Sequence, residues 1–368
     1  MHAFCLPASL VPAQREATAT LSASANHARF FWGTTLLQSY RSLRSICVSI
    51  YGLALGLLCI GFPASVSAAP DDHKYATVPF TYVDNRMMID CMINGQGPFV
   101  MIVDTGDPVI SITPETAKRL AVTVREAGTA TGAGNKSVKT GSTTLGTLSI
   151  GALSFKNADA EVIDLTEIRT KLHFSHLDGI IGYPILKQFA TFVNVDDGEI
   201  SFATTRPAIP TNATNTTFTG VLPVIAARIE GIATTVLVDA GDRSSLTLFT
   251  PFAKQHAFYV RYPSNRNIIT GFGIGGPIYA DVFTLPSLDV LGTHITGVVT
   301  RASRQTGGAF AGTDQGGSIG TGILKRFNIV YDYPHHTIIA WPSKYFKTPD
   351  HFVPPESTGV TYRPLDQS

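Results

Sequence analysis

The chain has 368 residues, of which 44% are hydrophobic and 15% charged, so it is long enough for two ordinary domains and apolar enough to give each a core. Its formal net charge of +1 provides neither the basic surface that nucleic-acid binding requires nor an acidic tail. Nucleic acid is therefore not an expected partner.

The first 69 residues differ in character from the rest of the chain. Arg41 and Arg44 precede an apolar segment at 46–62, and small residues follow it as far as Ala69. This order predicts a signal peptide, cleaved near Ala69, and hence an exported protein, periplasmic or secreted. The alternative is an uncleaved helix that anchors the chain, since the apolar segment approaches the length of a membrane-spanning helix. Contact with a membrane is expected only in that second case.

The cysteines do not provide a disulfide framework. Three of the four, Cys5, Cys47 and Cys59, belong to the leader, so that Cys91 stands alone in the remainder. An intramolecular disulfide is then impossible, and a zinc site built from cysteine pairs is not expected. The fold must be held together by its hydrophobic core.

Beyond the leader, short apolar or alternating segments are separated by Gly, Asn, Asp and Pro, a pattern that predicts an all-β protein. The clearest predicted strands are 76–83, 87–93, 99–104, 145–151, 189–195 and 199–204. Helical periodicity is scarce. A short helix is expected at 113–122, where Thr113 is the N-cap and Pro114 lies in the first turn, and shorter ones at 183–189 and 322–327.

A carboxylate directly follows the predicted strand, in the sequence "VDTGD" at 103–107. An ionised carboxylate is costly to bury unless other groups receive it, so packing alone does not explain Asp104. Asp and Gly are also common in turns, and a single Asp-Thr-Gly is compatible with a simple turn. The question is therefore whether the motif has a second copy.

The sequence repeats itself in two blocks. The segment "VDAGD" at 238–242 places Asp239 where the first copy has Asp104, and both copies continue into a hydroxyl-rich segment and a short helix with Ala-Lys. The second pair of similar blocks, at nearly the same spacing, is 177–195 and 316–332. Two blocks in the same order predict a tandem duplication.

The duplication suggests a division of the chain. After the leader at 1–69, an N-terminal lobe is expected at 70–205 and a C-terminal lobe at 206–341, followed by a tail at 342–368. Between the lobes, segment 204–220 is rich in Pro, Thr and Asn and is interpreted as a linker or an edge segment.

The paired motifs resemble those of the aspartic proteases, and in particular bacterial proteins with two retropepsin-like domains in tandem. Each half has an apolar-apolar-Asp-Thr/Ala-Gly turn and a later apolar-apolar-Gly turn, at 180–182 and 318–320. The resemblance implies two retropepsin-like β-barrel lobes related by pseudo-twofold symmetry, in a pepsin-like bilobal arrangement with few short helices. It also implies a monomer, because one chain then supplies both halves of the dimer that simpler relatives form.

In this family each lobe contributes one catalytic aspartate, which assigns that role to Asp104 and Asp239. Two adjacent carboxylates share a proton, so the ionised one activates a water and the protonated one donates to the developing oxyanion. The implied activity is that of an aspartic endopeptidase acting on an extended peptide or protein, with no cofactor and no metal. Gly106 and Gly241 would shape the two turns, and the Thr105 hydroxyl would bridge the two loops.

Two departures from the family pattern affect this site. Ala240 replaces a threonine, so one side of the hydrogen-bonded bridge is missing, at a cost of about 0.5–1.5 kcal/mol. Asp107 and Asp242 stand where the family has a small or hydroxyl residue, and as extra carboxylates they are expected to raise the pKa values of the pair and the pH of optimal activity. Alternatively they point toward Arg243 or solvent, or the four carboxylates hold a divalent cation.

Two glycine-rich segments, 130–137 and 271–276, are predicted to be hairpin tips. Asn135 replaces a glycine that a phosphate loop requires before Lys136, and Pro277 begins a strand-like segment where a dinucleotide site needs a helix. In the family such hairpins are flaps that close over the substrate and hydrogen-bond its backbone. The flap residues assigned on this basis are Gly132, Ala133, Gly134, Gly271 and Gly273.

Two other functions remain open. Ala240 and the extra acids are also compatible with a peptide- or protein-binding module that has the same scaffold and weak or no turnover. A structural envelope protein, held by an uncleaved leader, is the third possibility. A serine hydrolase is not expected, since no G-x-S-x-G turn is present.

Overall fold

The computed structural model describes residues 75–262, 265–349, 351–352 and 354–355. All of them belong to a single compact unit, Ala68–Ser368. The expected signal peptide, its cleavage point and most of the expected tail lie outside the described residues. None of the helices in the described part of the chain has the length and apolar character needed to cross a membrane.

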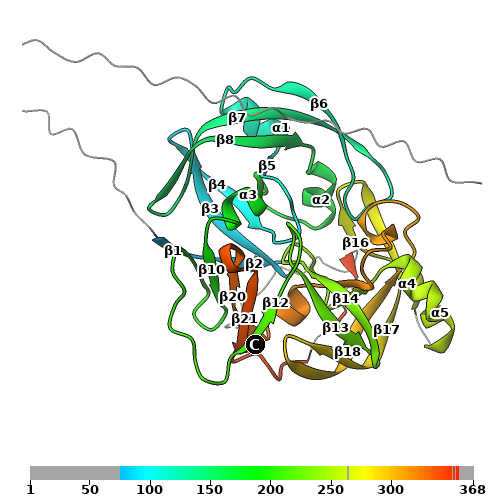
Figure 1. Ribbon diagram of the computed structural model, residues 1–368. Helices are drawn as coiled ribbons and strands as arrows, with labels where there is room; N and C mark the ends of the chain where they lie inside the picture. Colours follow the sequence, from blue (N-terminus) through cyan, green and yellow to red (C-terminus); the bar gives the residue numbers. More distant parts are fainter. Residues whose placement is uncertain (1–74, 263–264, 350, 353, 356–368) are drawn as a thin grey trace, which may run out of the picture. The chain divides into compact units, whose positions relative to one another are not determined.

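The described chain consists mainly of strands, with a few short helices, which confirms the all-β class (Figure 1). Its helical elements are α1 (Pro114–Arg119), α2 (Thr166–Lys171), α3 (Tyr183–Leu186), α4 (Thr250–Gln255), α5 (Phe258–Arg261), α6 (Thr321–Leu324) and the 3-10 helices η1 (Ala309–Ala311) and η2 (Tyr333–His335).

Helix α1 begins as the sequence predicts. Thr113 Oγ1 accepts a hydrogen bond from Thr116 N at 3.1 Å, and Pro114 takes the first helical position. Helices α3, α4 and α6 also lie in segments where short helices are expected. The sequence does not predict α2 and α5, because each buries a single side chain, Ile168 in α2 and Phe258 in α5, and so shows no helical period.

The first barrel is an eight-stranded sheet from the first half of the chain. In sheet order its strands are β2 (Thr81–Val83), β3 (Arg86–Ile93), β4 (Gln96–Val103), β9 (Gly179–Ile181), β5 (Ser111–Ile112), β8 (Leu153–Ile163), β7 (Val138–Ile150) and β6 (Arg125–Ala130). An additional pairing between β3 and β7 closes the sheet on itself.

The second barrel is a seven-stranded sheet from the second half. Its strands, in sheet order, are β13 (Val224–Ile229), β14 (Ile232–Val238), β19 (Gly317–Ile319), β15 (Leu246–Leu248), β18 (Thr293–Ser303), β17 (Gly276–Val290) and β16 (Asn265–Gly273). Here β13 and β17 make the closing pair.

The two barrels repeat one strand arrangement. Strand β4 runs parallel to β9, β9 antiparallel to β5, and β5 parallel to β8; β14, β19, β15 and β18 repeat these relations in the same order. Asp104 and Asp239 follow β4 and β14, so each stands at the carboxyl end of a parallel pair. The sequence duplication is thus matched by a repeated topology.

A third sheet joins strands from both halves. Its order is β1 (Tyr75–Pro79), β11 (Glu199–Ala203), β10 (Ala190–Asn194), β20 (Phe327–Asp332), β21 (Thr337–Pro342) and β12 (Thr214–Thr217). The antiparallel pair β10–β20 connects the two halves. Segment 204–220 therefore contributes an edge strand, β12. Tyr345 and Phe346 pack against the core, so the first residues of the expected tail are attached to it; the boundaries of the lobes remain predictions.

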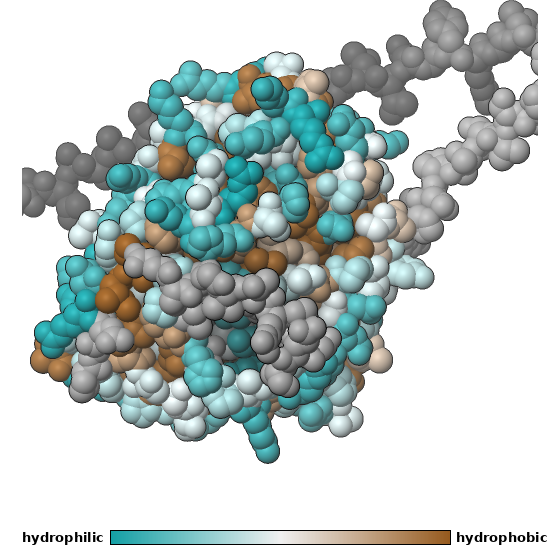
Figure 2. All heavy atoms as spheres, turned by 180° about the vertical axis from the view of Figure 1, so that it is seen from behind, coloured by the Kyte–Doolittle hydropathy of each residue, from teal (hydrophilic) through white to brown (hydrophobic). Residues whose placement is uncertain are grey.

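The surface offers no continuous apolar face in the view of Figure 2, where hydrophobic residues lie in several groups among hydrophilic ones. The large hydrophobic side chains most exposed in the described chain include Tyr75, Val221 and Val260. Exposed apolar residues at separate places are normal for a folded protein and do not by themselves indicate a partner.

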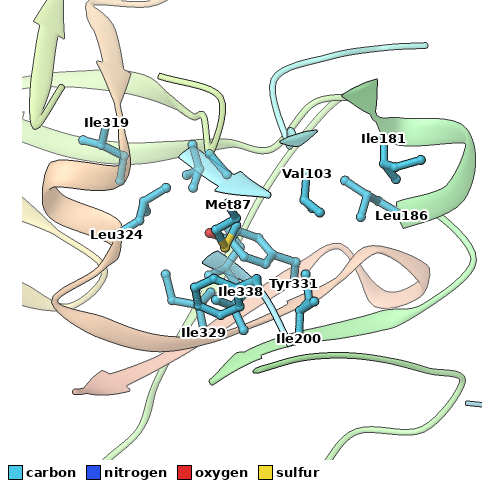
Figure 3. Close-up of a cluster of buried hydrophobic side chains, with 14 of the residues drawn as sticks. Met87, Val103, Ile181, Leu186, Ile200, Ile319, Leu324, Ile329, Tyr331 and Ile338 are labelled. Atoms are coloured by element: carbon cyan, nitrogen blue, oxygen red, sulfur yellow. The ribbon is translucent and has the colours of Figure 1, made fainter. Parts of the chain in front are cut away.

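One hydrophobic cluster runs through both barrels and the third sheet. In Figure 3, Ile181 and Leu186 lie on one side of Tyr331, and their repeat counterparts Ile319 and Leu324 lie on the other. All five side chains are buried. This shared core lies beneath the Asp-containing turns and holds them in place through the strands that precede them.

Candidate active site

The two Asp-containing turns lie directly against each other. The carboxyl groups of Asp104 and Asp239 share a hydrogen bond. A Cβ atom added to Gly106 would lie 2.7 Å from Cγ of Asp239, and one added to Gly241 would lie 2.0 Å from Oδ2 of Asp104. Each glycine is therefore required because the carboxyl group of the opposite turn occupies the space of a side chain.

Backbone amides fix the orientation of both carboxyl groups. Asp104 Oδ1 accepts from Gly106 N at 2.7 Å, and Asp239 Oδ1 accepts from Gly241 N and Asp242 N at 2.9 and 3.0 Å. Each aspartate thus accepts hydrogen bonds from its own turn and contacts the glycine of the other turn. The pair can exchange a proton without movement of the backbone.

The bridge beneath the pair is one-sided. Thr105 Oγ1 donates to Val238 O at 2.7 Å and accepts from Ala240 N at 2.9 Å. Ala240 has no hydroxyl that could make the reciprocal hydrogen bonds to the turn of Asp104. Its carbonyl oxygen, however, accepts a hydrogen bond from Thr321 Oγ1 at 3.1 Å. The loop of Asp239 is therefore held partly from within the second barrel.

Arg86 connects the first barrel to the turn of Asp239, and sequence reasoning missed it. Its Nε donates to Gly241 O at 2.9 Å, and its guanidinium pairs with Asp84. Asp84 also accepts from Arg243 Nε at 2.6 Å, so one carboxylate lies between two arginines. No local pattern reveals this contact, because Arg86 and Gly241 are 155 residues apart in the sequence.

The two extra acids have different surroundings. Asp242 is 5% exposed and accepts from Arg301 Nη2 at 2.8 Å, as well as from Ser244 and Thr247. Burial alone would raise the pKa of Asp242, but the Arg301 guanidinium and these hydrogen bonds hold it below its ordinary value. The expectation that Asp242 points toward Arg243 or solvent is wrong, because its partner is Arg301.

Asp107 is 9% exposed and accepts from Val109 N at 2.9 Å. Burial raises the pKa of Asp107 to about 6, and the charges of Glu161 and Asp239 add to the effect. Asp107 thus points neither toward solvent nor toward Arg243. Among the described residues it has no cationic partner.

The pKa values of the pair are raised, as the extra acids lead one to expect. Burial raises the pKa of Asp104 to about 6, the charge of Asp107 adds to this, and Arg86 opposes it. Burial raises the pKa of Asp239 well above its ordinary value, with further contributions from Asp104 and Asp242. The two aspartates titrate together, so their raised pKa values belong to the pair.

A cavity of about 860 Å³ lies over the pair. Residues of both Asp-containing turns line it, together with Arg86, Phe272 and residues between Gly308 and Gln315. Of the flap residues assigned from sequence, Gly132, Ala133 and Gly273 line the cavity, whereas Gly134 and Gly271 do not. The volume falls within the range of common ligand sites.

The two predicted hairpin tips exist, one between β6 and β7 and the other between β16 and β17. They meet: Gly134 N donates to Ile274 O at 2.9 Å, and Lys136 N donates to Gly275 O at 3.1 Å. Gly134 stands apart from the cavity because it packs against Gly275. The joined tips form one wall of the cavity.

A loop of the second barrel holds the first hairpin tip. Gln305 Nε2 donates to Ala133 O at 3.0 Å, and Asn135 Oδ1 accepts from Thr306 N and Gly307 N at 2.9 and 3.0 Å. Sequence reasoning singled out Asn135 only as a residue that breaks a phosphate motif. Its actual role is to anchor the hairpin.

The described residues contain no group of three or more His, Cys, Asp or Glu side chains arranged to hold a metal ion.

Comparisons with known proteins point to a protease family. The family model for aspartyl proteases matches residues 89–185, a segment that contains Asp104 and its turn. A comparison with curated protein sequences finds no match. Among solved structures, the chain is similar to an aspartic proteinase from Irpex lacteus, with 15% sequence identity and a TM-score of 0.47 over 74% of this chain and 99% of that one.

The family model supports the aspartic protease family for the segment that carries the first motif, residues 89–185. An aspartic-type peptidase is the class of hydrolase that this family implies.

Proposed function

We propose that the protein is an aspartic endopeptidase in which Asp104 and Asp239 together activate a water molecule. The observation that carries the proposal is the close approach of two half-buried carboxyl groups, each lying against the glycine of the other's turn, at the wall of a cavity of about 860 Å³. Structural carboxylates rarely lie together in this way, because both cannot remain charged.

The two aspartates have different tasks. Asp104, whose ionised form the charge of Arg86 favours, is the base that takes a proton from water. Asp239, protonated, donates to the carbonyl oxygen as it becomes an oxyanion. After attack, the C–N bond breaks as the proton on Asp104 passes to the leaving amine, and the former carbonyl oxygen returns its proton to Asp239 as the C=O bond forms again. General acid and base steps of this kind each contribute roughly 10²–10⁴-fold in rate.

The substrate is an extended segment of peptide. Backbone groups of the hairpin tips line the cavity and suit hydrogen bonding to a strand-like chain. Since Gly134 and Ile274 join the two tips, these contacts must open before a protein segment enters from the side.

The proposed location and assembly of the protein rest on the sequence alone. The leader favours export to the periplasm or beyond, with anchoring by an uncleaved helix as the alternative. A monomer is expected because both aspartates belong to one chain.

One observation favours a binding module without turnover, namely the missing half of the bridge at Ala240. It is outweighed by the intact Thr105 contacts and by the Thr321 hydroxyl at the Ala240 carbonyl.

Cleavage of a mixed peptide library by the purified chain, between about pH 3 and pH 8, tests the proposal. Mass spectrometry of the products would identify the cleaved bonds. Cleavage by the wild type and by Asp90→Asn, an exposed acid on β3, with none by Asp239→Asn, is the expected result. Folded wild-type protein that cleaves nothing would place the binding module first.

A further inference from the structure

Two acids on the first-barrel wall of the cavity have no cation to balance them. Asp107 and Glu161 both line the cavity. Asp107 is 9% exposed; its Oδ1 accepts from Val109 N, and its Oδ2 has no hydrogen-bond partner among the described residues. No described Lys, Arg or His forms an ion pair with either acid.

The second barrel shows what completes such a site. In the first barrel, Ser111 of β5 lies between Ile180 of β9 and Glu161 of β8. In the second, Thr247 of β15 lies between Ser318 of β19 and Arg301 of β18. Because Ile180 and Ser318 occupy the same place in the repeated Gly-containing block, Glu161 stands at the register position of Arg301.

The repeat therefore places opposite charges at equivalent positions. Arg301, 4% exposed, donates to the extra acid of its own barrel, Asp242, at 2.8 Å. In the first barrel the extra acid, Asp107, faces Glu161 instead, and their repulsion contributes to its raised pKa. Burying like charges is unfavourable, and an external cation would relieve it as Arg301 does in the second barrel.

The other charges of the cavity do not fill this role. Arg86 is held by Asp84 and Gly241 O, and Arg301 is held by Asp242 and Thr247. Asp314 at the cavity wall adds another negative charge.

We propose that Asp107 and Glu161 form a subsite that binds the cationic side chain, lysine or arginine, of a substrate residue next to the scissile bond. Ile163, Leu165 and Ile180 also line the cavity and suit the aliphatic stem of such a side chain. The proposal rests on the proposed protease function and adds a substrate class to it.

The test uses one cleavable peptide in which a residue flanking the scissile bond is Lys, Arg, norleucine, Gln or Glu. We expect kcat/KM of the wild type to be at least about tenfold higher with Lys or Arg than with norleucine, as for a charge-assisted contact in a partly buried site. Glu161→Gln should lose this preference while cleaving the norleucine peptide within about twofold of the wild type.

Two further variants sharpen the test. Glu161→Arg reproduces the Asp–Arg pair of the second barrel and should reject the Lys peptide. Asp159→Asn removes an exposed acid of the same strand that does not line the cavity, and it should keep the wild-type preference.

The outcomes separate this inference from the protease itself. A wild type that cleaves peptides without preferring Lys or Arg, or a Glu161→Gln variant that retains the preference, would overturn the subsite and leave the protease intact. If no peptide is cleaved, the proposed protease function fails, and the subsite is tested by the binding of the same peptides with a reduced scissile amide. Tighter binding of the Lys peptide than of the norleucine peptide, lost in Glu161→Gln, would support the subsite. Equal binding of the two peptides would overturn it. A rise in Tm with calcium ions that depends on Glu161 would also overturn it, because the acids would then hold a metal.

Discussion

Gly241 of the second barrel lies against the carboxyl group of Asp104 from the first, so closely that a Cβ atom would stand 2.0 Å from Oδ2. Gly106 has the reciprocal relation to Asp239. The two aspartates can therefore approach each other because each turn has a glycine, and no side chain, at the point where the opposite carboxyl group lies.

Gly241→Ala is expected to push Asp104 out of position and to lower kcat/KM by about 10²-fold or more, since displacements of about 1 Å have effects of this size. Gly271→Ala is the matched control, because its added Cβ would meet its nearest atoms at 3.6 Å, an ordinary contact. Similar activity in the two variants would show that the turns do not require this close approach.

The one-sided bridge gives a second prediction. Thr105→Val leaves Val238 O and Ala240 N without their partner and should lower the free energy of unfolding by about 1–3 kcal/mol. Thr105→Ser keeps the hydroxyl and should lose less than half as much. Equal losses in urea denaturation of the two variants would show that the hydrogen bonds of the hydroxyl contribute no more to stability than the packing of the methyl group.

The pH dependence of activity should reflect the raised pKa of Asp104. Because the base must be ionised, kcat/KM should rise with pH through an acidic limb near pH 6, the value to which burial raises the pKa of Asp104. Asp107→Asn removes a neighbouring negative charge and should move this limb to lower pH. An acidic limb that does not move would show that Asp107 has no electrostatic influence on the pair.

Asp242→Asn is a poorer probe of the same effect. It removes the partner of Arg301, which is 4% exposed, and leaves that cation buried without compensation. Loss of stability would then obscure any change in the pH profile.

Stability should change with pH in a defined direction. The pKa of Asp107 is 3.8 in the reference state and about 6 in the folded protein, so the folded chain holds a proton that the unfolded chain has released between these values. Asp107 therefore destabilises the fold progressively as pH rises through this window. The gain in Tm from Asp107→Asn should be larger at pH 7 than at pH 4; an equal gain at both would contradict the raised pKa.

The hairpin anchor predicts a local change in dynamics. In Asn135→Ala the amides of Thr306 and Gly307 lose their acceptor, and their hydrogen exchange should accelerate by about tenfold or more. The amide of Thr147, which donates to Asn94 Oδ1, should keep its wild-type protection. Unchanged exchange at Thr306 would mean that Asn135 does not hold the loop.

The parts of the fold that were predictable are those with a local or a repeated signal. The strands alternate in hydrophobicity, α1 carries its own cap at Thr113, and the repeated Asp-x-Gly block connects Asp104 with Asp239 although they lie far apart in the chain. The hairpin tips were recognisable because Pro277 excludes a helix.

The remaining parts depend on contacts that no short segment contains. Arg301 reaches Asp242 across 59 residues, and Asn135 reaches Gly307 across 172. A lone arginine or asparagine in a strand or turn has many possible partners, so its role emerges only from tertiary packing. This is why the charge of Asp242 is compensated and that of Asp107 is not, although both follow the same motif.

If the two aspartates act as one catalytic unit, neither works alone, and kcat/KM of Asp104→Asn and Asp239→Asn on a peptide that the wild type cleaves will show it. Each variant is expected to lose at least about 10³-fold, with Tm close to that of the wild type. Substantial cleavage by either folded variant would contradict it.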